Sequence, residues 1–525
     1  MNVLYCLRRA KQFHGDRLAI DHEGQQLTYR QLHDRVVDSA RKLRAAGVQA
    51  GDRVAVLMLN SPAYFNLYFS VPLAGALIVP LNTRWHMNEV IQTLADSGSE
   101  WVFVDERFAH CAQQIREALP HIKSIFYYAP GSCPEGLTDF RSLDGGQTSS
   151  EITFQEPHED DLVGLFYTSG TTGGPKGAML SHRNLYSNAV HALLPPALLP
   201  PHCKFLHAAP MFHLADVGAI LGLTLVGASH SFVPTFDAEA VLQAIQRYRI
   251  SNVVLVPAMI NAVVNHPSFS SYDLSSLERV AYGASPMPLP LLRLAKEKLR
   301  CEFSQGYGMT EVSPLITTLA PEHHRFDDSD RQFTPVKSAG QPVLGVEVRV
   351  VDDQDRDVPV GQSGEIITRG PNVMKGYWKR PEISAEVLRG GWMHTGDMGA
   401  FDEQGFLYIL DRKKDMIKSG SENVYTPEVE SALCGHPAIL EAAVIGVPDE
   451  KWGETIRAVV ALRAGADLTE AELIAWTRQR MTAFKCPTSV VFTEALPKGG
   501  TGKVQKSVLR EQFGGVHKGI GASPS

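Results

Sequence analysis

Hydrophobic residues along most of the chain follow a repeating order in which a short strand pattern is paired with a helical pattern. Arg53–Leu59 has the continuous apolar pattern of a buried strand, and Tyr64–Ala74 has the length and character of an apolar helix. The same pair recurs at Trp101–Asp105 and Ala109–Ala118, and the strand pattern Asn252–Val256 follows another helix. This order predicts an α/β fold in which the strands of layered sheets are mostly parallel.

One early helix has recognisable boundary signals. Thr28 and Gln31 have the spacing of a capping box, in which the two side chains satisfy free amides at the helix start. Apolar residues then recur at helical spacing as far as Leu43, and Gly47 is a natural stop. The sequence therefore predicts a capped helix that begins at Thr28.

The character of the chain changes after Asp411, where a charged turn is followed by short strands and one helix typical of a compact α+β unit. This change predicts a large N-terminal domain, residues 1–411, of several layered subdomains, and a small α+β C-terminal domain, residues 412–525. The predicted elements of the small domain are the strands Ala442–Val447, Ile456–Leu462 and Ser489–Thr493 and the helix Glu470–Thr482.

Composition narrows the class of protein. The 525 residues are 44% hydrophobic and 20% charged, as in a soluble globular protein of several core-sized units. The formal net charge of −7 argues against a nucleic-acid-binding surface, which needs a concentrated basic face. The seven cysteines are scattered and form no Cys-x-x-Cys pair, so we expect neither a zinc site nor a disulfide framework.

The apolar stretches Val71–Leu81 and Val217–Ala228 are too short to cross a bilayer, and each contains Pro or Gly. Met1–Ala10 lacks the long apolar run of a signal peptide. We therefore expect no integral membrane segment and a cytoplasmic protein, with peripheral membrane association as the alternative for an enzyme with an apolar substrate.

The segment Tyr167–Gly177 carries the strongest chemical signal. Its glycines let backbone amides turn toward an anion, its hydroxyls donate further hydrogen bonds, and Lys176 adds positive charge, which together suit a polyphosphate. It is not a Walker A loop, because Lys176 lies between Pro175 and Gly177 and no Ser or Thr follows it. A buried strand, Leu162–Phe166, leads into the loop, which makes a flexible linker a poor alternative.

This loop resembles the signature of the adenylate-forming superfamily, which includes acyl-CoA synthetases, peptide-synthetase adenylation domains and luciferases. Similar motifs follow in the family's order over nearly the whole chain, and the overall similarity favours bacterial fatty-acid–CoA ligases. The further motifs are Pro210–His213, Tyr282–Ser285, Gly306–Glu311, Thr395–Asp397, Asp411–Asp415 and Gly499–Lys503.

The resemblance implies an AMP-forming acyl-CoA ligase that uses ATP, Mg²⁺ and coenzyme A. Glu311 matches the magnesium-positioning glutamate, with Thr168 beside it as a second metal and phosphate ligand. Asp397 matches the carboxylate that accepts hydrogen bonds from the ribose, Arg412 a second ribose or phosphate contact, and Tyr307 the ring that lies against adenine. The other nucleotide contacts implied are Ser169, Gly170, Thr171, Thr172, Gly173, Lys176, Gly283, Ala284, Ser285, Gly306, Gly308, Met309 and Thr310.

Lys503 is implied as the catalytic residue of adenylation, because its ammonium can neutralise both the carboxylate and the α-phosphate. In the family the small domain is mobile. It brings this lysine in for the first step and turns about a hinge, here Lys414, for thioester formation, so that the active site spans an interdomain cleft. The loop Lys418–Asn423 would then face the thiol. It departs from the family pattern at Ser421, which replaces a glycine.

The acid is the least determined part of the prediction. His213 is expected to gate the acyl pocket, with a structural core histidine as an equal alternative, and Val217–Gly227 is apolar. These features favour a medium- or long-chain fatty acid, with an aromatic or cyclic acid second. Weaker alternatives are a stand-alone adenylation enzyme and a non-catalytic pseudo-synthetase. The expected partners are the carboxylic acid, ATP and CoA. Homodimer formation and a carrier-protein acceptor stay open.

Overall fold

The computed structural model describes residues 1–144, 154–168, 175–194, 203–326, 334–420, 422–498 and 504–515 of the chain. These residues form two units. The first contains Met1–Val348 and Thr368–Met393, and the second contains Arg349–Ile367 and the described residues from His394 onward. The predicted boundary between Asp411 and Arg412 is a different division, and it stays a prediction about the position of a hinge.

One layer of the first unit is a seven-stranded sheet with the order β7-β6-β5-β3-β4-β8-β9. All neighbours are parallel except the terminal pair β8–β9, as the strand-and-helix pattern predicts. The strands are β3 (Arg53–Leu57), β4 (Leu77–Pro80), β5 (Trp101–Val104), β6 (Ser124–Tyr127), β7 (Thr138–Asp139), β8 (Leu162–Thr168) and β9 (Lys176–Ser181).

The other layer is a nine-stranded sheet with the order β16-β15-β14-β13-β12-β10-β11-β1-β2. Its central strands, β10 to β14, run parallel, so their carboxyl ends meet at one edge, where α/β folds bind ligands. The strands are β1 (Leu18–His22), β2 (Gln25–Thr28), β10 (Lys204–His207), β11 (Ser229–Phe232), β12 (Asn252–Leu255), β13 (Arg279–Gly283), β14 (Glu302–Gly308), β15 (Leu315–Leu319) and β16 (Gln341–Pro342).

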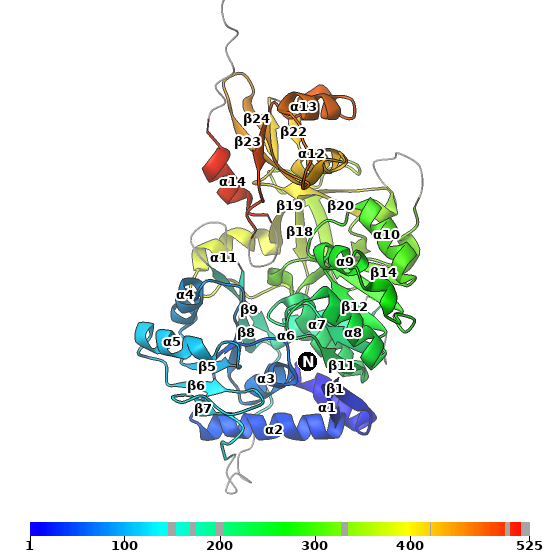
Figure 1. The fold of residues 1–525 in the computed structure, drawn as a ribbon. Coiled ribbons are helices and arrows are strands. Elements are labelled where there is room, and N and C mark those ends of the chain that lie inside the picture. Colours follow the sequence, from blue (N-terminus) through cyan, green and yellow to red (C-terminus); the bar gives the residue numbers. More distant parts are fainter. Residues whose placement is uncertain are drawn as a thin grey trace, which may run out of the picture. The chain divides into compact units, whose positions relative to one another are not determined.

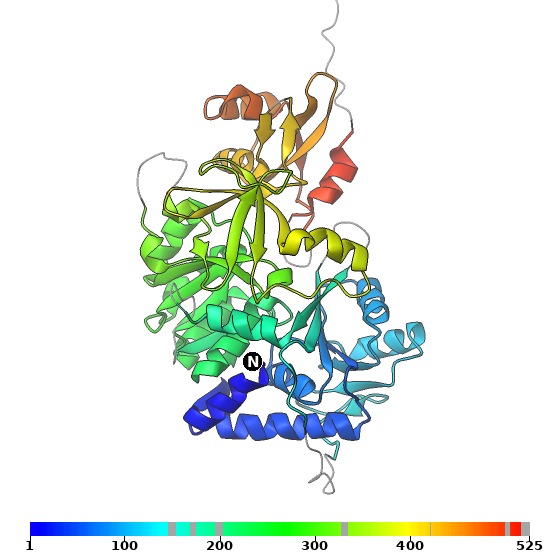
Figure 2. The same cartoon turned by 180° about the vertical axis from the view of Figure 1, so that it is seen from behind.

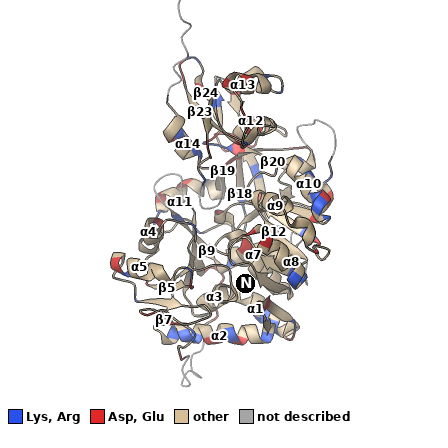
Figure 3. Cartoon of the chain, viewed as in Figure 1, with Lys and Arg blue, Asp and Glu red and all other residues tan. Residues whose placement is uncertain are grey.

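Helices of the first unit differ in how they are buried. In α3 (Pro62–Leu73) every residue from Tyr64 to Pro72 is buried, and α7 (Leu214–Val226) is nearly as enclosed, which explains why both are apolar on all sides. By contrast, α2 (Tyr29–Ala45) carries basic residues along its length (Figure 3) and begins at the predicted capping box of Thr28 and Gln31.

Other helices of this unit are α1 (Leu4–His14), α4 (Met87–Ser97), α5 (Ala112–Ala118), α6 (His182–His191), α8 (Ala238–Tyr248), α9 (Pro257–Val264), α10 (Leu289–Leu299) and α11 (Pro381–Val387). Short 3₁₀ turns are η1 (Ala109–Cys111), η3 (Phe269–Ser271), η4 (Thr310–Val312), η5 (Pro321–His323), η6 (Pro335–Lys337) and η7 (Arg389–Gly391). Both views show α1 and α2, in dark blue, side by side (Figures 1 and 2). Among the helices of the described ranges, none combines the length and apolar character that a membrane span requires.

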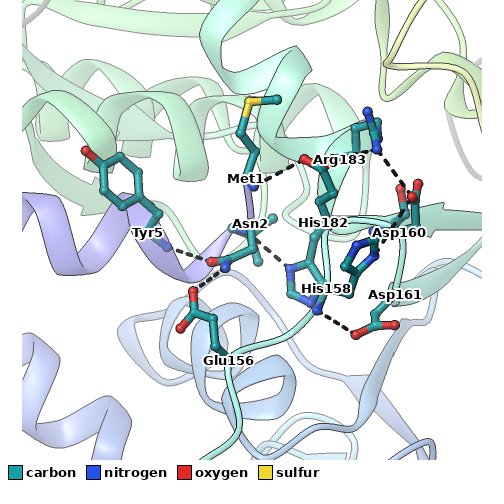
Figure 4. Close-up of polar contacts among 12 residues, drawn as sticks. Met1, Asn2, Tyr5, Glu156, His158, Asp160, Asp161, His182 and Arg183 are labelled. Carbon is teal, nitrogen blue, oxygen red and sulfur yellow. Dashed lines mark hydrogen bonds and ion pairs between the residues drawn. The ribbon is translucent and has the colours of Figure 1, made fainter.

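Polar contacts tie the N-terminus to the segment that leads into β8. The amine of Met1 forms an ion pair with Glu159 at 3.2 Å, and the backbone amide of Val3 donates to Nδ1 of His182 at 3.3 Å (Figure 4). Arg183, next along α6, also forms an ion pair with Glu159. The start of the chain and the start of α6 are therefore held by one acidic segment.

The second unit contains most of a four-stranded sheet, β17 (Glu347–Val351), β18 (Gly364–Arg369), β19 (Met393–Phe401) and β20 (Leu407–Arg412). It continues with a sheet of order β22-β21-β24-β23, in which β25 pairs with β24. The predicted helix Glu470–Thr482 ends earlier, at Arg478, because the chain turns at Gln479 and Arg480, and the extended residue Thr482 precedes η8 (Ala483–Lys485). The remaining elements are β21 (Ile417–Ser419), β22 (Glu422–Val424), β23 (Ile439–Asp449), β24 (Gly453–Leu462), β25 (Ser489–Thr493), α12 (Thr426–Cys434), α13 (Glu470–Arg478) and α14 (Lys506–Phe513).

Candidate active site

The predicted phosphate loop connects two paired antiparallel strands. Thr168 ends β8 opposite Lys176, the first residue of β9, and its hydroxyl lies 3.5 Å from the Lys176 carbonyl oxygen. Both residues are half-buried. The predicted contacts Ser169, Gly170, Thr171, Thr172 and Gly173 lie outside the described residues. The structure therefore describes the two ends of the loop and the sheet that supports them.

Asp96, in the last turn of α4, contacts Tyr167 near the end of β8. The hydroxyl of Tyr167 donates to its carboxylate at 2.6 Å, and Arg380 contacts the other oxygen at 2.9 Å. Burial raises the pKa of Tyr167, so the ring is a neutral donor. The Tyr167 ring also covers Gly177, where an added Cβ would lie 2.9 Å from the ring carbon that carries the hydroxyl. Sequence reasoning missed Asp96 as a partner of Tyr167.

The predicted adenine-binding segments lie side by side at the carboxyl ends of β13 and β14. Gly283 is paired with Gly306, and a Cβ on Gly283 would lie 2.4 Å from the Gly306 carbonyl oxygen. Gly308 approaches the chain even more closely, since its Cβ would lie 1.7 Å from the Pro314 carbonyl oxygen. Only glycine permits this packing, which explains the two Gly-rich motifs.

Side chains at this edge remain accessible. Ala284 is exposed and adopts φ +65°, a left-handed conformation that L-residues rarely adopt outside turns and functional sites. Ser285, Tyr307, Met309 and Thr310 are half-buried. The structure thus brings the two predicted segments together at one edge of the nine-stranded sheet, while the contact of Tyr307 with adenine stays a prediction.

Glu311 lies in η4, directly after this edge. It is only 5% exposed, so the alternative of an ordinary surface glutamate is wrong. The Tyr377 hydroxyl donates to one carboxylate oxygen at 2.6 Å, and the Met374 amide donates to the Glu311 carbonyl at 2.8 Å. The hydrogen bond from Tyr377 offsets part of the cost of burying this carboxylate.

Tyr377 belongs to a segment that sequence reasoning missed. The segment Met374–Trp378 pairs with β9, since the Met179 amide donates to the Gly376 carbonyl at 2.9 Å and the Trp378 amide donates to the Gly177 carbonyl at 2.8 Å. The available signal was a turn glycine followed by two aromatic residues. This segment therefore contacts both Glu311 and the strand that leaves the phosphate loop.

The start of α7 is the part of that helix that opens to solvent. Ala215 is exposed, whereas Leu214 and all residues from Asp216 to Leu225 are buried. His213 precedes the helix, is half-buried and packs on the Phe212 ring with centroids 4.3 Å apart. Burial, together with the charge of Arg84, lowers the pKa of His213 to about 4, so the ring is neutral at physiological pH.

A buried network of three polar side chains connects α7 to the neighbouring sheet. The carboxylate of Asp216 lies 2.8 Å from Nδ1 of His207, and Nε2 of His207 lies 2.9 Å from Nδ1 of His230. All three side chains are almost wholly buried, and Phe232 stacks on His207. Sequence reasoning did not predict this network, which joins α7 to β10 and β11.

The predicted ribose-binding residues lie together in the second unit. Asp397 on β19 is paired with Arg412 on β20, and Nε of Arg412 lies 2.6 Å from Oδ1 of Asp397. The Asp397 amide donates to the Thr395 hydroxyl at 3.1 Å. Asp397 is 5% exposed, which excludes the alternative of an ordinary turn residue, while its role toward ribose stays a prediction.

Lys414 follows in the turn after β20 and is exposed, with a pKa lowered by partial desolvation. The turn itself is closed by bonds from the Asp415 and Met416 amides to the Arg412 carbonyl, both at 2.9 Å. Lys503 and Ser421 lie outside the described residues, as does the Gly-rich loop around Lys503. The hinge and the catalytic lysine therefore stay predictions.

Comparison with known proteins identifies the family. The model of the AMP-binding enzyme family matches residues 6–378, and that of the AMP-binding enzyme C-terminal domain matches residues 428–503. A feruloyl-CoA synthase from an Amycolatopsis species is 41% identical over 500 residues, covering 94% of this chain and 96% of the relative. An indoleacetate–CoA ligase from Aromatoleum aromaticum is 37% identical over 488 residues, covering 92% and 93%.

A solved structure of the anthranilate CoA ligase AuaEII in complex with anthranoyl-AMP has a TM-score of 0.86 at 28% identity, covering 98% of this chain and 97% of that one. The expected fold, α/β with a large N-terminal and a smaller C-terminal domain, is thus confirmed. The expected lean toward fatty-acid ligases is not supported, because these relatives carry the names of aryl-acid ligases. The chain belongs to the AMP-binding enzyme family and is an acid–thiol ligase that uses ATP and CoA.

Proposed function

We propose that the chain is an aryl-CoA ligase, which couples an aromatic carboxylic acid to coenzyme A at the expense of ATP. The observation that carries the proposal is the similarity, over nearly the whole chain, to a feruloyl-CoA synthase and an indoleacetate–CoA ligase. Both names describe a flat aromatic group on a short carboxylate-bearing arm. The sequence alone favours a fatty acid, with an aromatic acid second, and these relatives favour the aromatic acid.

The chemistry at the start of α7 supports this choice. A neutral His213 packed on Phe212, beside the small exposed residue Ala215, offers planar and apolar contacts to an aromatic ring. Because His213 is uncharged, it offers these planar and apolar contacts without adding a positive charge. A carboxylic acid with an aromatic body therefore suits these residues.

In the first half-reaction a carboxylate oxygen attacks the α-phosphorus of ATP, and the bond to the bridging oxygen of pyrophosphate breaks. Lys503 is proposed to neutralise the oxygens of both reactants, while Thr168 and Lys176 hold phosphate oxygens. In the second half-reaction the sulfur of CoA attacks the acyl carbon of the adenylate and AMP leaves. Asp397 and Arg412 are proposed to hold the ribose.

Magnesium is part of the proposal, and the residues present fit it. Mg²⁺ in nucleotide sites is held by one or two carboxylates together with phosphates and waters. Glu311 is a buried carboxylate with one oxygen bonded to Tyr377, and in the described ranges no cluster of three or more His, Cys, Asp or Glu offers a closed protein cage. Glu311, with Thr168, would hold the ion, which would neutralise phosphate charge.

The test is pyrophosphate release by the purified full chain with MgATP, measured for each acid with and without CoA. The panel contains hydroxycinnamic, indole-acetic and benzoic acids, medium- and long-chain fatty acids, and amino acids. Release with an aromatic acid, accelerated by CoA and accompanied by an aromatic thioester, is the expected result. Activity confined to fatty acids would overturn the aryl assignment. Activity confined to amino acids without acceleration by CoA would favour a stand-alone adenylation enzyme, and ATP binding without any release would favour a non-catalytic protein.

A further inference from the structure

Glu311 is joined to Tyr377 by a short, buried hydrogen bond whose two partners lie far apart in sequence. The hydroxyl of Tyr377 is 2.6 Å from Oε1, and the two side chains are 7% and 5% exposed. A bond from a neutral donor to a carboxylate is stronger than one between neutral groups, and burial strengthens it further. The other carboxylate oxygen has no hydrogen-bond partner among the described residues.

Tyr377 also contacts Lys176, the first residue of β9. Nζ of Lys176 lies 5.8 Å from the centroid of its ring, within the range of a cation–π contact. Lys176 is the predicted phosphate-binding lysine, so a single tyrosine contacts the predicted metal ligand through its hydroxyl and the predicted phosphate ligand through its ring face.

The backbone around Tyr377 is fixed on both sides. The Tyr377 amide donates to the Ser384 hydroxyl at 2.8 Å, and the residue pairs with Ala178 of β9 in an isolated antiparallel bridge. Its neighbour Gly376 has φ +129°, which L-residues rarely adopt, so the turn that presents the ring depends on glycine. The ring therefore has little freedom to leave Glu311.

We propose that Tyr377 is a positioning residue for the metal–triphosphate part of the site. By holding Oε1 of Glu311, its hydroxyl would leave the second oxygen available to the metal, and its ring would restrain Lys176, which would bind phosphate. The effect of the hydroxyl should appear only when both metal and the β- and γ-phosphates are present, whereas the effect of the ring on Lys176 should need only the phosphates. This inference rests on the proposed magnesium-dependent use of ATP.

The experiment is calorimetric binding of MgATP, of ATP in EDTA and of AMP to the purified full chain and to Tyr377→Phe, which removes the hydroxyl and keeps the ring. We expect MgATP to bind roughly tenfold more weakly, as for loss of one hydrogen bond to a charged group, while ATP in EDTA and AMP keep their affinities. Tyr377→Leu, which also removes the ring face, should weaken ATP binding in EDTA as well.

Tyr29→Phe is the matched control. Tyr29 is fully buried in the same unit, and its hydroxyl donates to the Ala228 carbonyl, away from the site residues. This variant should lower the unfolding temperature without changing the ratio of MgATP to metal-free ATP affinity. The double variant Glu311→Gln, Tyr377→Phe should bind MgATP no more weakly than Glu311→Gln alone, because the tyrosine acts through the carboxylate.

The proposal is overturned if Tyr377→Phe keeps the wild-type ratio of MgATP to metal-free ATP affinity, or if AMP binding falls in parallel. It is also overturned if the two substitutions weaken MgATP binding additively. Failure of the proposed ligase function would look different. In that case the wild-type chain would release no pyrophosphate with any acid. Comparison of MgATP binding by the wild-type chain and Tyr377→Phe would still test the role of Tyr377.

Discussion

Nε of Arg412 lies 2.6 Å from Oδ1 of Asp397, across the paired strands β19 and β20. The guanidinium is half-buried and the carboxylate is almost wholly buried, so the pair holds Asp397 in one orientation. A carboxylate held in this way can accept hydrogen bonds from two adjacent hydroxyls without first reorganising. This orientation is compatible with the ribose-binding role proposed for Asp397.

Asp397→Asn should therefore impair recognition of the ribose hydroxyls. We expect roughly tenfold weaker binding of AMP, because an amide replaces a charged acceptor and loses its ion pair with Arg412. The sharper readout is discrimination between AMP and 2′,3′-dideoxy-AMP by calorimetry. The wild-type chain should prefer AMP strongly, and the variant should lose most of that preference. Equal discrimination by both chains would show that Asp397 does not contact the ribose.

Lys503→Ala should separate the two half-reactions. Formation of the acyl-adenylate should fall by roughly 100-fold or more, because a cation at the reacting oxygens is removed. Transfer of the acyl group from a synthetic aryl-adenylate to CoA should persist. Lys485→Ala is the matched control, since Lys485 lies in the same unit and pairs with Glu428 at 2.8 Å. Loss of both half-reactions in Lys503→Ala alone would argue against its restriction to adenylation.

A larger side chain at residue 215 should obstruct the acid. Ala215 is exposed at the start of a helix that is otherwise buried, so Ala215→Phe would place a ring where the acyl group is proposed to lie. We expect KM for the aromatic acid to rise roughly tenfold or more, with KM for ATP unchanged. Steady-state kinetics with each substrate varied in turn would measure this. An unchanged KM for the acid would place the acyl group elsewhere.

Acid should destabilise the chain through buried neutral histidines. Burial lowers the pKa of His182 to about 4, below the ordinary value of 6.5, so the unfolded state binds a proton that the folded state resists. Stability is therefore lost as pH falls from about 6.5 toward 4, with a contribution from this one group of at most about 2 kcal/mol at pH 5.

His182→Asn should reduce that loss, because asparagine does not titrate and still offers an oxygen to the Val3 amide. The measurement is the free energy of unfolding in urea at pH 7 and at pH 5. The difference between the two pH values should be smaller in the variant. An identical difference in both chains would show that His182 does not contribute to acid sensitivity.

Much of the fold could be predicted from local patterns. The capping box of Thr28 and Gln31, the parallel order of strands and the apolar character of α3 follow from periodicity and side-chain chemistry. The family resemblance also pointed to Glu311 and to the ends of the phosphate loop, and in the structure Tyr377 contacts both Glu311 and Lys176.

Tertiary partners could not be predicted in this way. Nothing in the local sequence around Tyr377 indicates that its hydroxyl meets Glu311, or that Asp96 at the end of α4 meets Tyr167. Such contacts depend on which loops meet across a sheet edge. The acid could not be predicted for a related reason, since an apolar helix such as α7 does not distinguish an acyl chain from an aromatic ring.

The first unit is built from two separate segments of the chain, and this limits how a mobile C-terminal domain, or lid, could be attached to it. The chain passes from one unit to the other after Val348, after Ile367 and after Met393. Three covalent connections oppose a large rotation, whereas the single turn at Arg412–Asp415 would allow one. A lid that turns as the family resemblance implies would therefore leave β17 to β20 in place. A chain truncated after Arg412 would lack the whole of such a lid. A chain truncated after Met393 would still contain Arg349–Ile367, which belongs to the second unit.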